Sequence, residues 1–145
     1  NWQYEDNLVI VDRYVYSNIA YQCAKLADEE KRKELFHWIL QLEFVYFGIP
    51  RPDLSVFLDV PFDFVKSKLN SDREGEDRTY LKGDADINEA NTEFQRKVKE
   101  MYHYSVQQET DFKLLPCFKT SGTILPPEEI HNRLIQMLKE YGILS

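Results

Sequence analysis

Apolar residues in this chain occur in two patterns, short continuous runs and longer stripes with helical spacing. The runs cover residues 8–11, 54–60 and 113–118. Short, bounded runs rich in β-branched and aliphatic residues are typical of strands buried on both faces of a parallel sheet. The sequence therefore predicts three parallel strands, although Pro116 removes one hydrogen-bond donor from the third.

The longer stripes predict helices between these runs. Ser17 is a candidate N-cap for the first helix, which carries apolar residues up to Leu26. A second helix begins in "ADEEKRKE" and ends at Gly48, because "IPRPD" cannot continue a helix. Pro61 opens a third helix at a position where proline is tolerated. A long helix near residues 87–109 and a closing one in "LPPEEIHNRLIQMLKEY" complete the set.

The second helix, residues 31–47, is apolar on more than one face. Five apolar residues follow the helical spacing and four more widen the stripe: Leu35, Trp38, Ile39, Leu42 and Tyr46, then Phe36, Leu40, Phe44 and Phe47. A helix that faces only one core needs a narrower stripe. We therefore expect this helix to be buried twice, against its own core and against a partner chain.

The predicted elements follow the order β, α, α, β, α, α, β, α. Strands that alternate with helices favour an α/β fold, a parallel sheet covered by helices. The sequence contains neither an internal repeat nor an interdomain linker, so residues 1–145 are predicted to form a single domain.

Composition and charge narrow the functional classes. The 145 residues are 43% hydrophobic and carry a net charge of -7, which argues against a non-specific nucleic-acid binder. No apolar stretch reaches the roughly 18 residues that a membrane span needs. Cys23 and Cys117 lie far apart in apolar surroundings, which fits reduced thiols and a cytoplasmic location.

The first apolar run stops at Asp12, which Arg13 follows directly. In open α/β sheets, ligands bind beyond the carboxyl ends of the strands, so both residues would stand at the rim of a site. The alternative is an Asp–Arg ion pair that caps the next helix. These two residues alone leave both interpretations open.

A polar segment, about residues 71–86, separates two predicted helices. It places Arg73, Arg78 and Lys82 among many carboxylates. A solvated charged loop has this composition, and so does a lid over a phosphorylated ligand, because planar guanidinium groups bind phosphoryl oxygens in a bidentate manner.

These segments together resemble the thymidylate kinases, which transfer the γ-phosphoryl group of ATP to dTMP. The resemblance rests on "VDRYVYSNIAYQ", "LEFVYFGIPRPDLSVFLDV", and "DREGEDR" followed by "DINEANTEFQRKVKEMY", in this order and with similar spacing. It covers most of the chain and implies a fold like that of the P-loop nucleoside monophosphate kinases. It also implies dTMP and ATP as substrates, Mg²⁺ as cofactor, and a homodimer formed through helices that include residues 31–47.

The resemblance implies roles for residues near the first strand. Asp12 would hold Mg²⁺ through water and take part in catalysis, and Arg13 would bind the phosphate of dTMP. Asn18 and Tyr21 would face the base and the sugar, with Gln22 as a weaker candidate. From the residues alone, Tyr21 is equally a core residue on an apolar face and Asn18 a helix-start residue.

The resemblance also assigns roles in and after the polar segment. Arg73 and Arg78 would reach the transferred phosphoryl group as catalytic lid residues, and Asp86 and Glu89 would contact the acceptor or its metal. Two positions depart from the family pattern, which has an aromatic residue or histidine and an acid where this chain has Asn88 and Asn91.

One family motif is missing from the 145 residues. They contain no G-x-x-x-x-G-K-[ST] loop, whose backbone N–H groups and lysine bind the ATP phosphates. In the family, the strand before that loop lies between the strands that correspond to 8–11 and 54–60. We therefore expect this sequence to be the carboxyl-terminal part of a kinase, incomplete at its N-terminus and inactive alone. The alternatives are a non-catalytic α/β domain that binds a nucleotide or a partner, and a purely structural domain.

Overall fold

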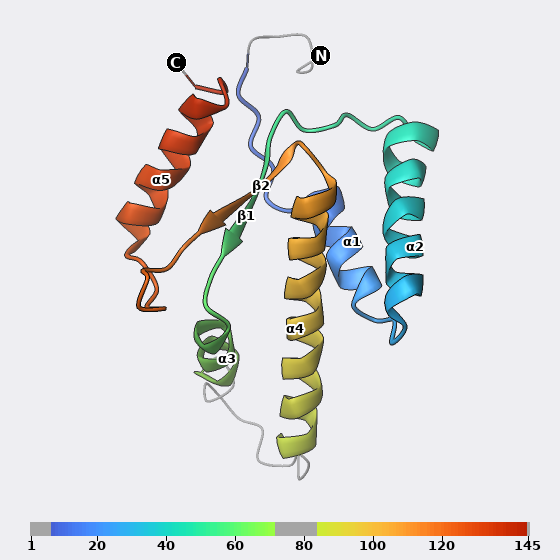
Figure 1. The fold of residues 1–145 in the computed structure, drawn as a ribbon, viewed down its shortest axis with the longest axis vertical. Coiled ribbons are helices and arrows are strands. Elements are labelled where there is room, and N and C mark those ends of the chain that lie inside the picture. Colours follow the sequence, from blue (N-terminus) through green and yellow to red (C-terminus); the bar gives the residue numbers. More distant parts are fainter. Residues whose placement is uncertain (1–6, 72–83, 145) are drawn as a thin grey trace.

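The computed structural model of the chain describes residues 7–71 and 84–144, with side chains described outside residues 68–90. In chain order the elements are α1 Val15–Cys23, α2 Glu29–Leu40, η2 Gln41–Tyr46, β1 Ser55–Asp59, α3 Phe62–Ser71, α4 Asp84–Gln108, β2 Phe112–Pro116 and α5 Pro127–Glu140. Figure 1 shows α1, α2 and α4 on one side of a small sheet, α5 on its other side and α3 below it.

The sheet consists of β1 and β2, which pair in parallel. The register runs from Ser55 opposite Phe112 to Asp59 opposite Pro116. One further hydrogen bond, from the Cys117 N–H to the Asp59 carbonyl at 2.8 Å, extends the pairing beyond Pro116. The prediction of an α/β fold with these two strands in parallel is confirmed.

The predicted strand at residues 8–11 is wrong, because these residues have no regular secondary structure. Their side chains are exposed, Ile10 at 83% of its surface. β-branched residues favour extended backbone, but a strand forms only where another strand supplies its hydrogen bonds. Within the described part of the chain, β1 pairs with β2 alone.

The hydrophobic core lies between α1, α2 and α4, with α1 in the middle (Figure 1). From these helices and β2 it draws Val15, Tyr16, Ile19, Ala20, Cys23, Ala24, Phe36, Ile39, Leu40, Val98, Met101 and Phe112. Small residues such as Ala20 and Ser105, both fully buried, let α1 and α4 approach closely. Tyr16 stacks on Phe112 with ring centroids 4.3 Å apart, which attaches the sheet to this helical core.

Helix α1 begins one turn earlier than its predicted cap. Tyr14 occupies the N-cap position without a side-chain hydrogen bond, and Ser17 lies inside the first turn, so the predicted Ser17 cap is wrong. Helix α2 has a side-chain cap, because Asp28 accepts a hydrogen bond from the Lys31 N–H at 3.1 Å.

The predicted second helix changes its winding before it ends. Residues of η2 form a π-helix, in which the Phe47 N–H donates to the Leu42 carbonyl at 2.9 Å. Gly48 then takes a left-handed backbone with φ 62°, and the Ile49 N–H reaches back to the Glu43 carbonyl at 3.1 Å. The predicted end at Gly48 is confirmed.

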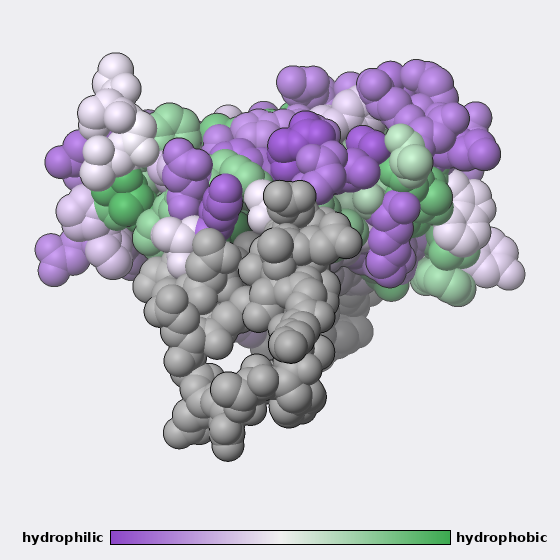
Figure 2. Space-filling view, turned by 90° about the horizontal axis from the view of Figure 1, so that it is seen from below, coloured by the Kyte–Doolittle hydropathy of each residue, from purple (hydrophilic) through white to green (hydrophobic). Residues whose placement is uncertain are grey.

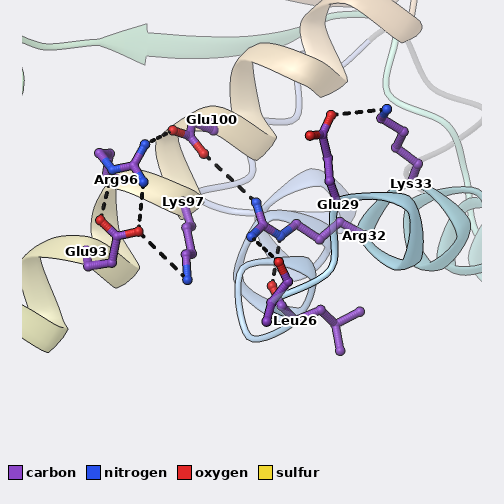
Figure 3. A network of polar contacts seen from close by, with 9 residues as sticks. Leu26, Glu29, Arg32, Lys33, Glu93, Arg96, Lys97 and Glu100 are labelled. Atoms are coloured by element: carbon purple, nitrogen blue, oxygen red, sulfur yellow. Dashed lines mark hydrogen bonds and ion pairs between the residues drawn. The ribbon is translucent and has the colours of Figure 1, made fainter.

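Ion pairs on the surface join α2 to α4 (Figure 3). Arg32 of α2 lies 4.0 Å from the Glu100 carboxylate of α4, and it donates hydrogen bonds to the Leu26 and Ala27 carbonyls. Arg96 pairs with Glu93 and Glu100 within α4. Exposed pairs of this kind contribute little to stability, so the helices are held mainly by their apolar contacts.

A polar cluster closes the amino end of the sheet. The Tyr16 hydroxyl donates to Asp111 Oδ1 at 2.7 Å, and Arg51 pairs with Glu109 at 3.0 Å and with Asp111 at 3.8 Å. Burial, followed by the Asp111 hydrogen bond, raises the pKa of Tyr16, so this hydroxyl keeps its proton. The Arg51 guanidinium also lies 4.2 Å from the Phe44 ring centroid. The cluster ties α1 to the segments that precede β1 and β2.

Three sequence predictions concern the remaining segments. Most of the predicted lid, residues 71–86, lies outside the described residues, while Ser71 ends α3 and Asp84 begins α4. The closing helix is present as α5, none of whose residues is fully buried. Among the described helices, none is both long and apolar enough to cross a membrane.

Both cysteines are free thiols and are buried. Burial raises the pKa of Cys23 to about 11 and also raises that of Cys117. The thiolate is the reactive form of cysteine, so neither side chain is placed for nucleophilic chemistry at neutral pH.

A matched pair of substitutions can distinguish the buried face of the second helix from its exposed face. Phe36 is fully buried, whereas Phe47 is 59% exposed. We expect Phe36→Ala to lower the free energy of unfolding by about 3–5 kcal/mol, and Phe47→Ala to change it by less than about 0.5 kcal/mol in the monomer. Urea denaturation at low protein concentration measures both. Equal effects would contradict the assignment of Phe36 to the core.

Candidate functional site

Arg13 lies directly before α1 in a strained backbone. Its φ of 64° is in the left-handed region, which costs a non-glycine residue about 1–2 kcal/mol. Strain of this kind persists where the surroundings fix the chain, and it is concentrated at functional sites. The Arg13 guanidinium lies 5.5 Å from the ring centroid of Tyr21, within the range of a cation–π contact.

Around Arg13, polar side chains are exposed. The side chains of Asp12 and Asn18 form neither a hydrogen bond nor an ion pair with any residue that the structure describes, and the Gln22 side chain accepts a hydrogen bond from Lys25 at 2.9 Å. No ion pair joins Asp12 to Arg13, and Tyr14 holds the N-cap position, so the alternative of an ion-paired cap is wrong. These polar groups remain accessible to a ligand.

Aromatic residues form the floor beside Arg13. Tyr21 is half-buried and meets Phe94 of α4 edge to face, with centroids 6.0 Å apart. Tyr102, also on α4, stacks on Phe57 of β1 at 4.5 Å, with only 6° between the ring planes. Burial raises the pKa of Tyr102, and the nearby Ser17 side chain offsets part of that rise. Residues of α1, α4 and β1 therefore meet at this point.

The carboxyl end of β1 carries a buried charged cluster. Asp59 is 5% exposed, and Lys99 Nζ lies 2.7 Å from its Oδ1. Lys99 Nζ also donates a hydrogen bond to the Val60 carbonyl at 2.7 Å, so its ammonium group contacts both the Asp59 carboxylate and the backbone beyond it. His103 Nε2 lies 3.5 Å from Asp59 Oδ2.

Figure 2 shows the molecule from below, at the end where β1 finishes and α4 begins. The coloured surface visible there mixes hydrophilic side chains with apolar patches. No group of three or more potential metal ligands occurs among the residues that the structure describes.

Several predicted site residues are not placed by the structure. Arg73 and Arg78 lie outside the described residues. Asp86 and Glu89 belong to the first turns of α4, but their side chains are not among those described. The structure thus brings together Arg13 and Tyr21 and leaves the predicted lid contacts untested.

Sequence reasoning missed the part of the site that α4 and β1 supply. The residues concerned are Phe57, Asp59, Phe94, Lys99, Tyr102 and His103. Asp59 could have been found by the argument used for Asp12, because it also ends an apolar run. The α4 residues gave no such signal, since aromatic residues at helical spacing are usually core.

Comparison with known proteins identifies the family. A sequence model described as thymidylate kinase matches residues 3–120, which is most of the chain. The chain belongs to the thymidylate kinase family. The resemblance found in the sequence is confirmed.

The family includes relatives of modest identity. A probable thymidylate kinase of Pyrococcus horikoshii is 30% identical over 135 residues, which cover 93% of this chain and 53% of that protein. One from Pyrococcus abyssi is also 30% identical, with 91% and 52% covered. The thymidylate kinase of Mycobacterium tuberculosis is 34% identical over 84 residues, 56% of this chain and 39% of that protein. The chain thus spans about half the length of the two Pyrococcus relatives and a smaller share of the Mycobacterium tuberculosis one. No solved structure gave a significant match.

The strain at Arg13 can be measured separately from the role of its side chain. Arg13→Gly and Arg13→Ala both remove the guanidinium, but only glycine adopts a φ of 64° without strain. We expect the glycine variant to be more stable by about 1 kcal/mol, as measured by urea denaturation. The control pair is Glu34→Gly and Glu34→Ala at an exposed position of α2, where glycine should be the less stable by a similar amount. The same order at both positions would show that Arg13 is unstrained.

Proposed function

We propose that the protein containing this chain is a thymidylate kinase that transfers the γ-phosphoryl group of ATP to dTMP and gives dTDP. Its fold would be that of a P-loop nucleoside monophosphate kinase. The observation that carries the proposal is Arg13, held in a strained backbone over Tyr21 in a chain of this family. The protein names of the relatives support the same reaction class.

The acceptor site is proposed around Arg13. A planar guanidinium binds two phosphate oxygens at once, and this one has no carboxylate partner among the described residues. Tyr21 and the exposed Asn18, with Gln22 beside them, would contact the sugar and the base. Tyr21 is fixed against Phe94, so it would act as a rigid wall of the pocket.

The transfer step is proposed for residues of the lid segment. Arg73 and Arg78 would close over the assembled complex and stabilise the charge that spreads over the transferred phosphoryl group. Asp86 and Glu89, at the start of α4, would contact the acceptor or its metal. This assignment rests on the family motif, with the residues matched one by one.

Mg²⁺ fits the side chains that are present. It usually keeps several water molecules and is held by one or two carboxylates together with the substrate phosphates. Asp12 is exposed and unpaired within the described residues, so it can hold the ion through water without a preformed ligand cluster. Bound there, the ion would neutralise charge on the ATP phosphates.

An apolar hollow offers a place for the adenine ring of ATP. It has a volume of about 480 Å³ and lies between α3, α5 and the loop before α5. Phe64, Ile124, Leu125 and Ile130 supply apolar surface to it. The phosphate loop is not among these 145 residues, so we expect this stretch alone to show no turnover.

Substitution of the arginines distinguishes binding from transfer. In the full-length gene product, Arg13→Ala should strongly raise the KM for dTMP, because Arg13 contacts the acceptor before and during transfer. Arg78→Ala should mainly lower kcat, by roughly 10³-fold if it acts as an arginine finger, and Arg73→Ala should do so less. Lysine at position 13 or 78 should restore little of the lost activity, because its ammonium group does not reproduce the planar, bidentate geometry of a guanidinium group. Initial rates with dTMP and ATP–Mg²⁺ measure these effects.

A control arginine lies outside the proposed site. Arg96 is half exposed on α4 and pairs with Glu93 and Glu100 of the same helix (Figure 3). Arg96→Ala should leave both kinetic constants near their original values. Near-normal turnover by both the Arg13 and the Arg78 alanine variants would refute these assignments, and binding of dTMP without turnover by the unaltered protein would favour a non-catalytic binding domain.

A homodimer is also part of the proposal, through a narrower surface than the sequence predicts. Phe36 and Leu40 are buried within the chain, and Phe44 is half-buried. The large apolar side chains that remain exposed on this helix are Trp38, Val45, Tyr46 and Phe47, at 57%, 76%, 80% and 59%. The π-helical turn presents the last three together at the end of the helix. A group of large exposed apolar side chains is typical of a protein interface.

Sedimentation tests the dimer. The unaltered protein should sediment as a dimer at tens of micromolar, roughly where an interface of standard size holds. Val45→Glu should give monomers, because it would bury an unpaired charge in the interface. Tyr141→Glu, at a 49% exposed aromatic residue outside this helix, should leave the dimer intact. Monomers of the unaltered protein would contradict the proposal.

A further inference from the structure

A buried carboxylate at the end of β1 has no role in the acceptor site proposed above. Asp59 is the last residue of the strand, and its side chain is 7% exposed. Two basic side chains of α4 face it, Lys99 at 2.7 Å from Oδ1 and His103 at 3.5 Å from Oδ2. Lys99 also donates a hydrogen bond to the carbonyl of Val60, just beyond the strand.

Stability alone is a weak reason for such a cluster. Removing a carboxylate from water costs several kcal/mol, and well-packed apolar residues in place of a buried ion pair are often as stable or more stable. Asp59 is the buried member of this cluster, whereas Lys99 and His103 remain partly exposed. What the cluster does supply is a fixed geometry between the strand end and the helix.

The contacts form two matched rows. On β1, Phe57 and Asp59 are two residues apart and therefore lie on the same face of the strand. On α4, Lys99, Tyr102 and His103 are spaced by three and four residues and therefore lie on one face of the helix. Phe57 stacks on Tyr102 at 4.5 Å and meets the His103 ring edge to face at 5.6 Å. Together these contacts fix the position of α4 along its axis and its rotation about that axis, relative to β1.

The position of α4 in turn shapes the acceptor site. Its residue Phe94 packs on Tyr21, and its residue Tyr102 lies close enough to Ser17, in the first turn of α1, for Ser17 to lower its pKa. Arg13 stands just before that turn, and its guanidinium lies over Tyr21. A shift of α4 would therefore move the groups that hold Tyr21 and Arg13. Small displacements of positioning groups are enough to change binding and turnover strongly.

We propose that Asp59, with Lys99, is a positioning residue for acceptor binding, which holds α4 so that Tyr21 and Arg13 face dTMP. The proposal rests on the proposed function for its substrate. It assigns no contact between Asp59 and the substrate. It predicts an effect on the KM for dTMP rather than on the transfer step.

Matched substitutions on α4 test this role in the full-length gene product. Lys99→Met should raise the KM for dTMP about tenfold while kcat changes less than about threefold. Asp59→Asn should have the same effect, because it removes the charge and keeps the shape. Lys97→Met is the control, since Lys97 is on the same helix and forms an ion pair with Glu93 alone, at 3.8 Å, among the residues that the structure describes. Lys99→Arg should keep the KM of the unaltered protein, because arginine can contact both Asp59 and the Val60 carbonyl.

Hydrogen exchange supplies a second readout that does not depend on catalysis. The segment from residue 13 to residue 21 forms no hydrogen bond or ion pair with Asp59 or Lys99, yet the proposal couples it to them through α4. In Lys99→Met its amides should exchange at least about threefold faster than in Lys97→Met, because a loosened α4 permits local opening. Lys99→Arg should return the rate to that of the control.

The outcomes separate this inference from the proposed function. If the unaltered protein does not phosphorylate dTMP, the proposed function fails, and the exchange comparison still decides whether the cluster positions α1. If Lys99→Met matches Lys97→Met in both KM and exchange, the positioning role is overturned while the kinase assignment stands. Equal loss of stability in both methionine variants without a change in KM would also overturn it.

Discussion

The packing of α1 against α4 is the constraint on which the rest of the structure depends. Ile19, Ala20 and Cys23 of α1 are fully buried, and across from them α4 contributes Val98, Met101 and the buried Ser105. Two of these α1 residues and Ser105 are small, so the helices lie close and tolerate little change in volume. Because Arg13 precedes α1 and the Asp59 contacts are made by α4, this one interface fixes where both polar groups stand.

The strained backbone at Arg13 follows from the same interface. The helix cannot start later, because Val15 and Tyr16 are already buried, and Tyr16 is held by its stack on Phe112 and its hydrogen bond to Asp111. The chain must therefore turn sharply at residue 13 to enter α1. The left-handed backbone of Arg13 makes that turn, and the core supplies the free energy that maintains it.

Sequence patterns predicted most elements of this fold because helical stripes and proline or glycine boundaries are local signals. Gly48 ended its helix as expected, and β1 and β2 paired in parallel. The run at residues 8–11 failed for a non-local reason, since β-branched residues alone do not provide a neighbouring strand. The helix cap failed because burial of Tyr16 overrode the preference of Ser17 for a cap position.

The site was predictable only where its residues follow a strand-like run or a family motif. Arg13 and Tyr21 were found in this way, and the structure brings them together. Tyr102 and Lys99 were not, because their significance comes from Phe57 and Asp59, which are more than 35 residues distant in sequence. A contact between distant segments leaves no periodic trace in either of them.

The two ends of the sheet differ in how their charges are satisfied. At the amino end, Arg51 pairs with both Glu109 and Asp111, and the neutral Tyr16 hydroxyl donates to the same carboxylates, so one cation is shared by two anions. At the carboxyl end, the buried Asp59 carboxylate has Lys99 and His103 beside it. The exposed Asp12 forms no ion pair with a described residue, and the Arg13 guanidinium lies over the Tyr21 ring. Charged groups without a partner leave electrostatic free energy to be gained from a ligand, and a phosphate monoester beside Arg13 with a cation beside Asp12 would satisfy both groups.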